Sequence, residues 1–488
     1  MWLYDPLRHR SILLSGGIRA RLDEGGLVKL RLILLVVVLT GTGAGMLLGA
    51  GSASALAPTV ISTGGSPRLI AISPDGTKAY VGNSTFSGHV DVIDVATDTV
   101  TATIAVGSAP EGIGVSPDGS LVYTANLFDN TVSVIDTATN TVTNTISGLG
   151  AGPQSVAFTP NGAKAYIGDY FGASVSVIDV ATHTVTSVIA GVALARQIVV
   201  SPDGSKAFVA SAGSNSVKVI DTATDTIQAS IAVSNAPWGM ALSPDGTKAY
   251  ATLNNGGIAI ITVANNTLAS TITGLDPDSI GVVISRDGTT AYVTNTASAD
   301  LQFVDLAGGT VTQTIAMPTD PLGVALTPNG AKLYVADNGA ASVSAFTFPL
   351  IAATTPSQLT VGSPYSFTVV SDGAPTFAVT AGALPAGLTL DTTTGVVSGT
   401  PTSSGPASFS ITATNTYGSN TRAYSVTVAA AATSSPAPST TPVPGASPAA
   451  TQTLAATGAA SLSMGLFAMA LLVTGAALLA LARRLGMS

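Results

Sequence analysis

The chain has 488 residues, of which only 9% are charged, and its formal net charge is −8 with no cysteine. The lack of cysteine excludes both a disulfide framework and a thiolate metal site. Residues 58–457 contain 10 Lys and Arg against 23 Asp and Glu, a net charge of −13. Nucleic acid is therefore not an expected partner, because its binding relies on a basic surface.

Residues 1–57 are predicted to be a secretory signal peptide. Basic residues up to Lys29 precede an apolar run from Leu32 to Leu39, and small residues ending at Ala57 form the cleavage site. The basic segment is unusually long, so a translation start near Val28 in place of Met1 stays open. A retained membrane anchor is the alternative interpretation of the same segment.

A short motif then recurs at a nearly constant interval. SPDG begins at Ser73, Ser116, Ser201 and Ser243, with SRDG at Ser285 and TPNG at Thr159 and Thr327. The spacing is 42 or 43 residues, which is typical of a repeat architecture. Asp-Gly or Asn-Gly between two apolar runs is a hairpin signal, because Gly supplies the positive φ that the turn needs.

Each repeat is predicted to form four short antiparallel strands. In the second repeat the two-residue alternation of apolar residues places them at 113–116, 121–126, 132–136 and 142–146. Seven such units over residues 58–348 indicate an all-β, seven-bladed β-propeller. The last unit stops after its third strand, near Phe348. Residues 59–62 resemble a fourth strand, so we expect them to complete the last blade and close the ring.

The segment Ala291-Tyr292-Val293-Thr294-Asn295 resembles the YVTN-repeat family of seven-bladed β-propellers. Looser copies begin at Ala79, Val122, Ala165 and Leu333. The resemblance implies a fold found in microbial surface proteins, in lactonase-like enzymes and in amine-dehydrogenase subunits. The fold therefore does not decide between binding and catalysis.

Comparison of the repeats predicts which face of the ring carries a site. The PDG turns and the connections from third to fourth strands hardly vary and lie on the same face of the ring. We therefore expect that face to have a structural role. The opposite face has variable connections that carry Phe86, Phe128, Tyr170 and Phe171. Five residues before each turn motif, at the mouth of the ring, stand Arg68, Glu111, Gln154, Arg196, Trp238, Ile280 and Leu322.

This mouth is polar over four successive blades and apolar over the next three. We therefore expect Arg68, Glu111, Gln154, Arg196 and Trp238 to bind an amphipathic ligand such as a glycan or a peptide. The alternative is an Arg68–Glu111 ion pair with ordinary loop packing, because ion pairs are common on protein surfaces.

No catalytic, metal or cofactor site is expected from the residue pattern. His9 lies in the leader, His183 replaces an Asp or Asn of the repeated turns, and His89 begins a third strand. These positions assemble no ordinary metal site, and the turn aspartates belong to different blades. A lactonase-like enzyme that uses Arg68, Glu111 and Arg196 remains the alternative.

The 42-residue period ends before residue 349. Residues 349–430 contain LPAGLTL from Leu384 and GTP from Gly399, a pattern that resembles the immunoglobulin-like (cadherin-like) modules of bacterial surface proteins. The resemblance implies a β-sandwich, for which a spacer role is expected. Residues 431–453 consist mainly of Ala, Ser, Thr and Pro and are predicted to be an extended linker.

The C-terminal segment, 454–488, resembles the cell-wall sorting signal of Gram-positive bacteria. A transmembrane helix is predicted at 459–482, followed by Arg483 and Arg484. The pentapeptide before it, of the LAxTG type, consists of Leu454, Ala455, Ala456, Thr457 and Gly458. The resemblance implies cleavage by a sortase and attachment of Thr457 to peptidoglycan, and a plain membrane anchor is the alternative.

The expected function is that of a non-enzymatic binding or adhesion protein on the surface of a Gram-positive, actinobacterial cell. Its partners would be a sortase, peptidoglycan and an extracellular glycan or protein. Two alternatives stay open: an extracytoplasmic lactonase-like or dehydrogenase-subunit-like enzyme, and a structural surface-layer protein.

Overall fold

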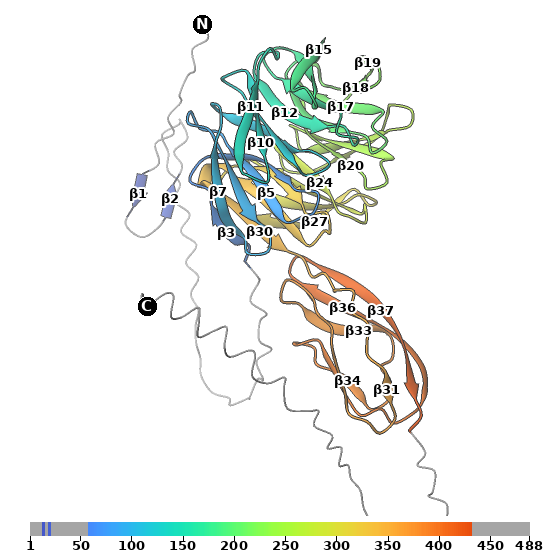
Figure 1. The fold of residues 1–488 in the computed structure, drawn as a ribbon. Helices are drawn as coiled ribbons and strands as arrows, with labels where there is room; N and C mark the ends of the chain where they lie inside the picture. The colour runs from blue at the N-terminus through green and yellow to red at the C-terminus, as the bar shows by residue number, and fades with distance from the viewer. Residues whose placement is uncertain (1–11, 15–17, 21–56, 432–488) are drawn as a thin grey trace, which may run out of the picture. The chain divides into compact units, whose positions relative to one another are not determined.

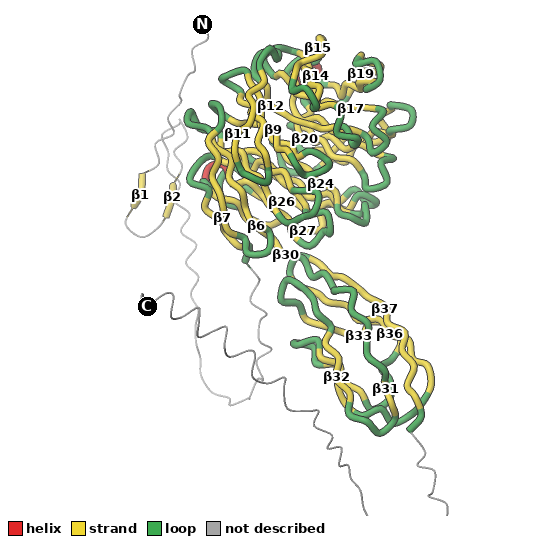
Figure 2. Tube along the Cα trace, in the orientation of Figure 1, coloured by secondary structure: helices red, strands yellow, loops and turns green. Residues whose placement is uncertain are grey.

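The computed structural model describes residues 12–14, 18–20 and 57–431. Almost all regular structure in these residues is β-strand, as Figure 2 shows, and the helical segments are two short turns, η1 (Ala212–Ser214) and η2 (Asn338–Ala340). Within these ranges no helix is long and apolar enough to cross a membrane. A two-stranded hairpin, β1 (Ile12–Leu14) with β2 (Ile18–Ala20), lies in the predicted leader.

Several predicted segments lie outside the described residues. They are the leader other than this hairpin and Ala57, the linker from residue 432 onward, the sorting pentapeptide 454–458 and the transmembrane helix 459–482. They stay predictions.

Within the described residues, seven antiparallel sheets of four strands follow one another, and each corresponds to one predicted repeat (Figure 1). Blade 1 contains β4 (Pro67–Ile72), β5 (Lys78–Asn83), β6 (His89–Asp94) and β7 (Thr99–Ala105). Blade 2 contains β8 (Pro110–Val115), β9 (Leu121–Asn126), β10 (Thr131–Asp136) and β11 (Thr141–Ile146). Blade 3 contains β12 (Pro153–Phe158), β13 (Lys164–Asp169), β14 (Ser174–Asp179) and β15 (Thr184–Ala190).

Blades 4 to 7 repeat this pattern. Blade 4 contains β16 (Ala195–Val200), β17 (Lys206–Ser211), β18 (Ser216–Asp221) and β19 (Thr226–Ala232). Blade 5 contains β20 (Pro237–Leu242), β21 (Lys248–Leu253), β22 (Gly257–Thr262) and β23 (Thr267–Thr273). Blade 6 contains β24 (Ser279–Ile284), β25 (Thr290–Asn295), β26 (Asp300–Asp305) and β27 (Thr310–Ala316). Blade 7 contains β28 (Pro321–Leu326), β29 (Lys332–Asp337), β30 (Ser342–Thr347) and β3 (Thr59–Ser62).

The predicted closure of the ring is confirmed. Strand β3, at the start of the described propeller, pairs antiparallel with β30, and Figure 1 shows the two side by side. The first strands of neighbouring blades contact one another around the whole ring, including β28 with β4. The pairing of β3 with β30 covers an edge of blade 7 that would otherwise be open.

The apolar core of the propeller lies between the blades. One cluster joins Val90 and Val92 of blade 1 to Ile113 and Val122 of blade 2, and another joins Ile61 and Tyr334 of blade 7 to Val81 of blade 1. Because a twisted four-stranded sheet cannot bury both faces alone, each blade depends on its neighbours. The propeller is therefore stable as a closed ring of stacked sheets.

A β-sandwich follows the propeller, in agreement with the immunoglobulin-like resemblance. One sheet has the order β31 (Leu359–Thr360), β37 (Gly418–Ala429), β36 (Gly405–Asn415) and β33 (Thr376–Gly382). The other sheet has the order β32 (Tyr365–Thr368), β35 (Val396–Gly399) and β34 (Leu388–Leu390). A separate core that includes Phe377, Phe409, Ile411 and Tyr424 fills the space between these two sheets.

Candidate functional site

The innermost strand of every blade is irregular at the predicted site position. The pairing of β8 with β9 passes from Pro110 to Gly112, so Glu111 is an extra residue in the ladder. The pairing of β12 with β13 omits Gln154 in the same way. In the other five blades the shift spans two residues, as between Pro67 and Ile70. Such bulges change the direction of a side chain and are common beside functional sites.

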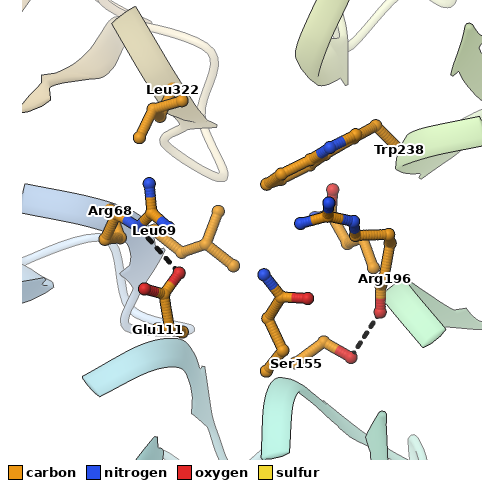
Figure 3. A pocket seen from close by; sticks show the side chains of 9 residues that line it. Arg68, Leu69, Glu111, Ser155, Arg196, Trp238 and Leu322 are labelled. Atoms are coloured by element: carbon orange, nitrogen blue, oxygen red, sulfur yellow. Dashed lines mark hydrogen bonds and ion pairs between the residues drawn. The ribbon is translucent and has the colours of Figure 1, made fainter. Parts of the chain in front are cut away.

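The structure brings the five predicted residues together in one opening at the centre of the ring. We call it the mouth opening, and it is lined by Arg68, Leu69, Glu111, Gln154, Ser155, Arg196, Gln197, Trp238 and Leu322 (Figure 3). The space inside, open solvent included, is about 350 Å³, but only about 10 Å³ of it can hold the centre of a water molecule. The side chains therefore fill most of the mouth opening, and only a small group can enter it.

Arg68 and Glu111 form the ion pair that the sequence offered as an alternative. The Nε of Arg68 donates to Oε2 of Glu111 at 2.7 Å, and Ser84 Oγ donates to Oε1 at 2.9 Å. Glu111 is 6% exposed, so burial strengthens this pairing relative to a surface ion pair. Within the described residues, the side chain of Arg68 donates through Nε alone, which leaves its two terminal nitrogens for a ligand.

Arg196 is held between two aromatic rings on the opposite side. Its Cζ lies 4.3 Å from the centre of the Tyr170 ring and 4.2 Å from that of Trp238, and Figure 3 shows the indole along the guanidinium. One terminal nitrogen donates to the Tyr170 hydroxyl at 3.2 Å. Burial lowers the pKa of Arg196, and the charge of Arg68 adds to this, while Tyr170 and Glu111 oppose it. The cation–π contacts hold the cation in place.

Two buried polar atoms of the mouth opening have no hydrogen-bond partner among the described residues. They are Nε of Arg196, a donor, and Oε1 of Gln154, an acceptor. Gln154 is 7% exposed. An unpaired buried polar group costs about 1–3 kcal/mol, so a ligand that satisfies both atoms would remove a penalty already present in the protein.

Comparison of the repeats missed three lining residues, each of which directly follows a predicted one: Leu69, Ser155 and Gln197. The other four blades have glycine here, at Gly112, Gly239, Gly281 and Gly323. A Cβ at Gly281 would lie 2.4 Å from the carbonyl oxygen of Leu322, so these glycines allow close packing of the inner strands. The break in the glycine pattern was visible in the sequence and could have identified them. Ile280, included in the predicted ring, does not line the mouth opening.

The variable loops around the mouth opening expose aromatic rings, as the sequence comparison suggested. Phe86 and Phe128 are stacked, with ring centres 5.9 Å apart, and are 87% and 56% exposed. Phe171 contacts the ring of Tyr170 and is also exposed. Exposed apolar rings of this kind are typical of interaction surfaces.

Neither of the two histidines in the described residues lines the mouth opening. His89 lies 3.3 Å from the carbonyl oxygen of Thr63, and Nδ1 of His183 lies 2.7 Å from the Tyr123 hydroxyl. The ionisable groups of the mouth opening itself are Arg68, Glu111 and Arg196. The site therefore offers two cations and one carboxylate that is already hydrogen-bonded twice.

The fold and this central opening define a β-propeller protein with an appended immunoglobulin-like domain. Residues 50–350 match the family model described as Lactonase, 7-bladed beta-propeller. This match covers more than half of the chain, which therefore belongs to that family. Residues 348–429 match the model described as Putative Ig domain.

Among solved structures, the chain is similar to one titled Kuenenia stuttgartiensis Hydrazine Synthase. The two are 21% identical with a TM-score of 0.53, and the similarity covers 61% of this chain and 98% of that one. At this identity the likeness shows the fold alone. No curated protein matches the chain in sequence.

Proposed function

We propose that this chain is a non-enzymatic binding protein of the cell surface, whose propeller takes up a ligand at the mouth opening. One observation carries the proposal: Arg196 Nε and Gln154 Oε1 both belong to the lining of the mouth opening and are buried without a hydrogen-bond partner among the described residues. A binding site needs such unsatisfied groups before the ligand arrives. Most buried polar groups in proteins are paired, so two unpaired groups in one opening are available to a ligand.

A binding screen with site variants tests this function. The full chain is presented with glycans, peptides and cell-surface extracts, and bound ligands are compared between wild type and R196A, R68A and W238A. Each variant should lose about tenfold or more in affinity, because each removes a charged or aromatic contact. Arg286→Ala is the matched control, since Arg286 is an exposed arginine on a turn outside the mouth opening. Unchanged ligand binding by all three site variants would contradict the proposal.

The second candidate is a lactonase-like enzyme, which membership of the propeller family favours. In that case Glu111 would act on a water molecule and the arginines would stabilise the developing oxyanion. Glu111 already accepts hydrogen bonds from Arg68 and Ser84, which fix its carboxylate in position. Lactone hydrolysis by the wild type that Glu111→Gln abolishes would establish the enzyme and refute a purely binding role.

The cellular location is part of the same proposal. The predicted signal peptide, the LAxTG-type pentapeptide and the apolar segment with its basic tail together support display on a Gram-positive cell wall. The immunoglobulin-like domain and the linker would then serve as a stalk. If Thr457→Ala leaves the protein covalently attached to peptidoglycan, sorting at this pentapeptide is wrong.

A further inference from the structure

The mouth opening is positively charged although the protein is acidic. Two guanidinium groups, Arg68 and Arg196, face a single carboxylate, Glu111. The chain as a whole has a net charge of −8. The two arginines attract a negatively charged group of the ligand to the mouth opening, whereas the rest of the acidic surface repels it.

The size of the mouth opening restricts that anionic group. Only about 10 Å³ can hold the centre of a water molecule, and side chains from six of the seven blades converge on it. A planar carboxylate presents two acceptor oxygens in one plane, which matches the N–H groups of a guanidinium. It can accept from the unpaired Nε of Arg196 and from a terminal nitrogen of Arg68.

Gln154 adds a requirement for a hydrogen-bond donor. Its Oε1 is buried and unpartnered, and it belongs to the same small opening as the Arg196 Nε. A ligand that offers only a carboxylate would leave this acceptor unsatisfied. The ligand must therefore carry an N–H or O–H group close to its carboxylate.

The remaining lining decides between these two donors. Leu69, Leu322 and the Trp238 ring are the apolar part of the lining, and Figure 3 shows both leucines on the side of Arg68. A uronic acid carries hydroxyl groups around its ring, which these leucines cannot satisfy. An acylated amino acid carries a carboxylate, an amide N–H and an apolar side chain on a single carbon.

We infer that the mouth opening binds the free carboxyl end of an acylamino acid with an apolar side chain. The carboxylate pairs with Arg196 and Arg68, the amide N–H donates to Gln154, and the side chain packs against Leu69 and Leu322. This inference rests on the proposed binding function and names its ligand chemistry. The same group occurs at the C-terminus of a peptide and in a free N-acyl amino acid.

Trp238 provides a direct signal for the test. The chain has two tryptophans, so Trp2→Phe leaves Trp238 as the only one in the full chain. Its fluorescence is titrated with N-acetyl-L-leucine, with N-acetyl-L-leucine amide and with 4-methylpentanoate. Loss of the charged pairing in the amide should weaken binding about tenfold or more, and 4-methylpentanoate, which lacks the N–H, about fivefold or more.

Two variants in the same background assign these contacts. Arg196→Lys keeps the charge but removes the planar N–H pair, and binding of N-acetyl-L-leucine should weaken. Gln154→Leu should reduce the preference for N-acetyl-L-leucine over 4-methylpentanoate, because the acceptor is gone. Arg286→Ala should leave every affinity unchanged. An unaltered preference in Gln154→Leu would overturn the assigned orientation.

Two further probes separate ligand classes and sources. The peptide Ala-Ala-Leu and its amide show whether the site accepts a peptide C-terminus. If Ala-Ala-Leu binds as tightly as N-acetyl-L-leucine or more tightly, the ligand is a peptide. If it binds more weakly, the ligand is a free acylamino acid. Both results support the inference. Tighter binding of D-glucuronate than of N-acetyl-L-leucine would overturn it while leaving the proposed function intact. No fluorescence response to any acylamino acid at concentrations up to about 10 mM would also overturn the inference. The screen with cell-surface extracts would still decide the proposed function.

Discussion

The repeated turn shows what each residue of the motif contributes. In the first copy Gly76 adopts a φ of 72°, and Asp75 Oδ1 accepts from Ser73 Oγ and from the backbone N–H of Thr77. Hydrogen bonding by Ser73 lowers the pKa of Asp75. The glycine also faces a proline of the preceding turn: a Cβ on Gly119 would lie 3.5 Å from Cδ of Pro74. Pro and Gly therefore recur because neighbouring turns contact each other around the ring.

Asp169, like Asp337, is a buried aspartate for which pH should matter. It is fully buried at the end of β13 and accepts hydrogen bonds from Ser174 and Ser176. Burial raises the pKa of Asp169 to about 6, from a usual value of 3.8. Between pH 3.8 and about pH 6 the folded state therefore keeps a proton on Asp169 that the unfolded state has released. This contribution to stability is complete below about pH 3.8 and is lost as the pH rises through about 6.

Replacement of Asp169 by Asn should therefore stabilise the protein at pH 7.5, by about 1–3 kcal/mol, and lessen the pH dependence between 4 and 6, while Asp337 keeps its own contribution. Blade 2 already has an asparagine, Asn126, at the corresponding position. Urea unfolding between pH 4 and 8 measures the effect. Asp203→Asn is the control of opposite sign, because hydrogen bonding by Ser201 lowers the pKa of Asp203 and its charge stabilises the folded state at neutral pH. An unchanged pH profile in Asp169→Asn would refute the argument.

Among the strands, the innermost and outermost positions of a blade have different tasks. The inner strands carry the bulges that direct residues such as Glu111 and Gln154 into the mouth opening. The outer strands also bulge, as between Val92 and Ile93 in the pairing of β6 with β7. Bulges and exposed threonines make an edge strand a poor template for pairing with another molecule. Strand β3 differs from the other outer strands in its place in the sequence: it completes blade 7 but lies at the N-terminal end of the propeller.

Strand β3 should contribute to stability through one buried side chain. Ile61 is 4% exposed and packs with Tyr334 and Val343, whereas Val60, on the same strand, is 62% exposed. Ile61→Ala should lower the free energy of unfolding by about 2–4 kcal/mol, because it leaves a cavity at the ring closure. Val60→Ala is the matched control and should change it by less than about 0.5 kcal/mol. Chemical denaturation measures both, and equal effects would show that β3 does not hold the ring closed.

For the molecule as a whole, the same interblade contact occurs at the ring closure and far from it. Lys332 and Tyr334 of blade 7 bind Asp98 of blade 1, at 2.7 Å each. Within the continuous part of the ring, Lys164 and Tyr166 of blade 3 bind Asp225 of blade 4 in the same way. Asp98 and Asp225 both have a φ of 53°, so the two sites are closely matched.

Asp98→Ala and Asp225→Ala should cost similar global stability, about 1–3 kcal/mol each, because each breaks one ion pair with a lysine and one hydrogen bond from a tyrosine. They should differ in local opening. Only the closure depends on pairing between distant ends of the propeller, so Asp98→Ala should increase amide hydrogen exchange in β3 and β30, and Asp225→Ala should not. Identical exchange patterns in the two variants would mean that the closure is no weaker than the other blade boundaries.

The amino-acid sequence was enough for the seven repeats, the strands, the closure by residues 59–62 and the sandwich that follows, because turn motifs and two-residue alternation are local signals. Counting back from each turn also identified Arg68, Glu111, Gln154, Arg196 and Trp238. Only the tertiary structure decided how these side chains meet. The inner bulges, which direct Glu111 and Gln154 into the mouth opening, depend on packing between blades that are about 42 residues apart in the sequence. The placement of Arg196 between Tyr170 and Trp238 likewise joins neighbouring repeats, which no local pattern encodes.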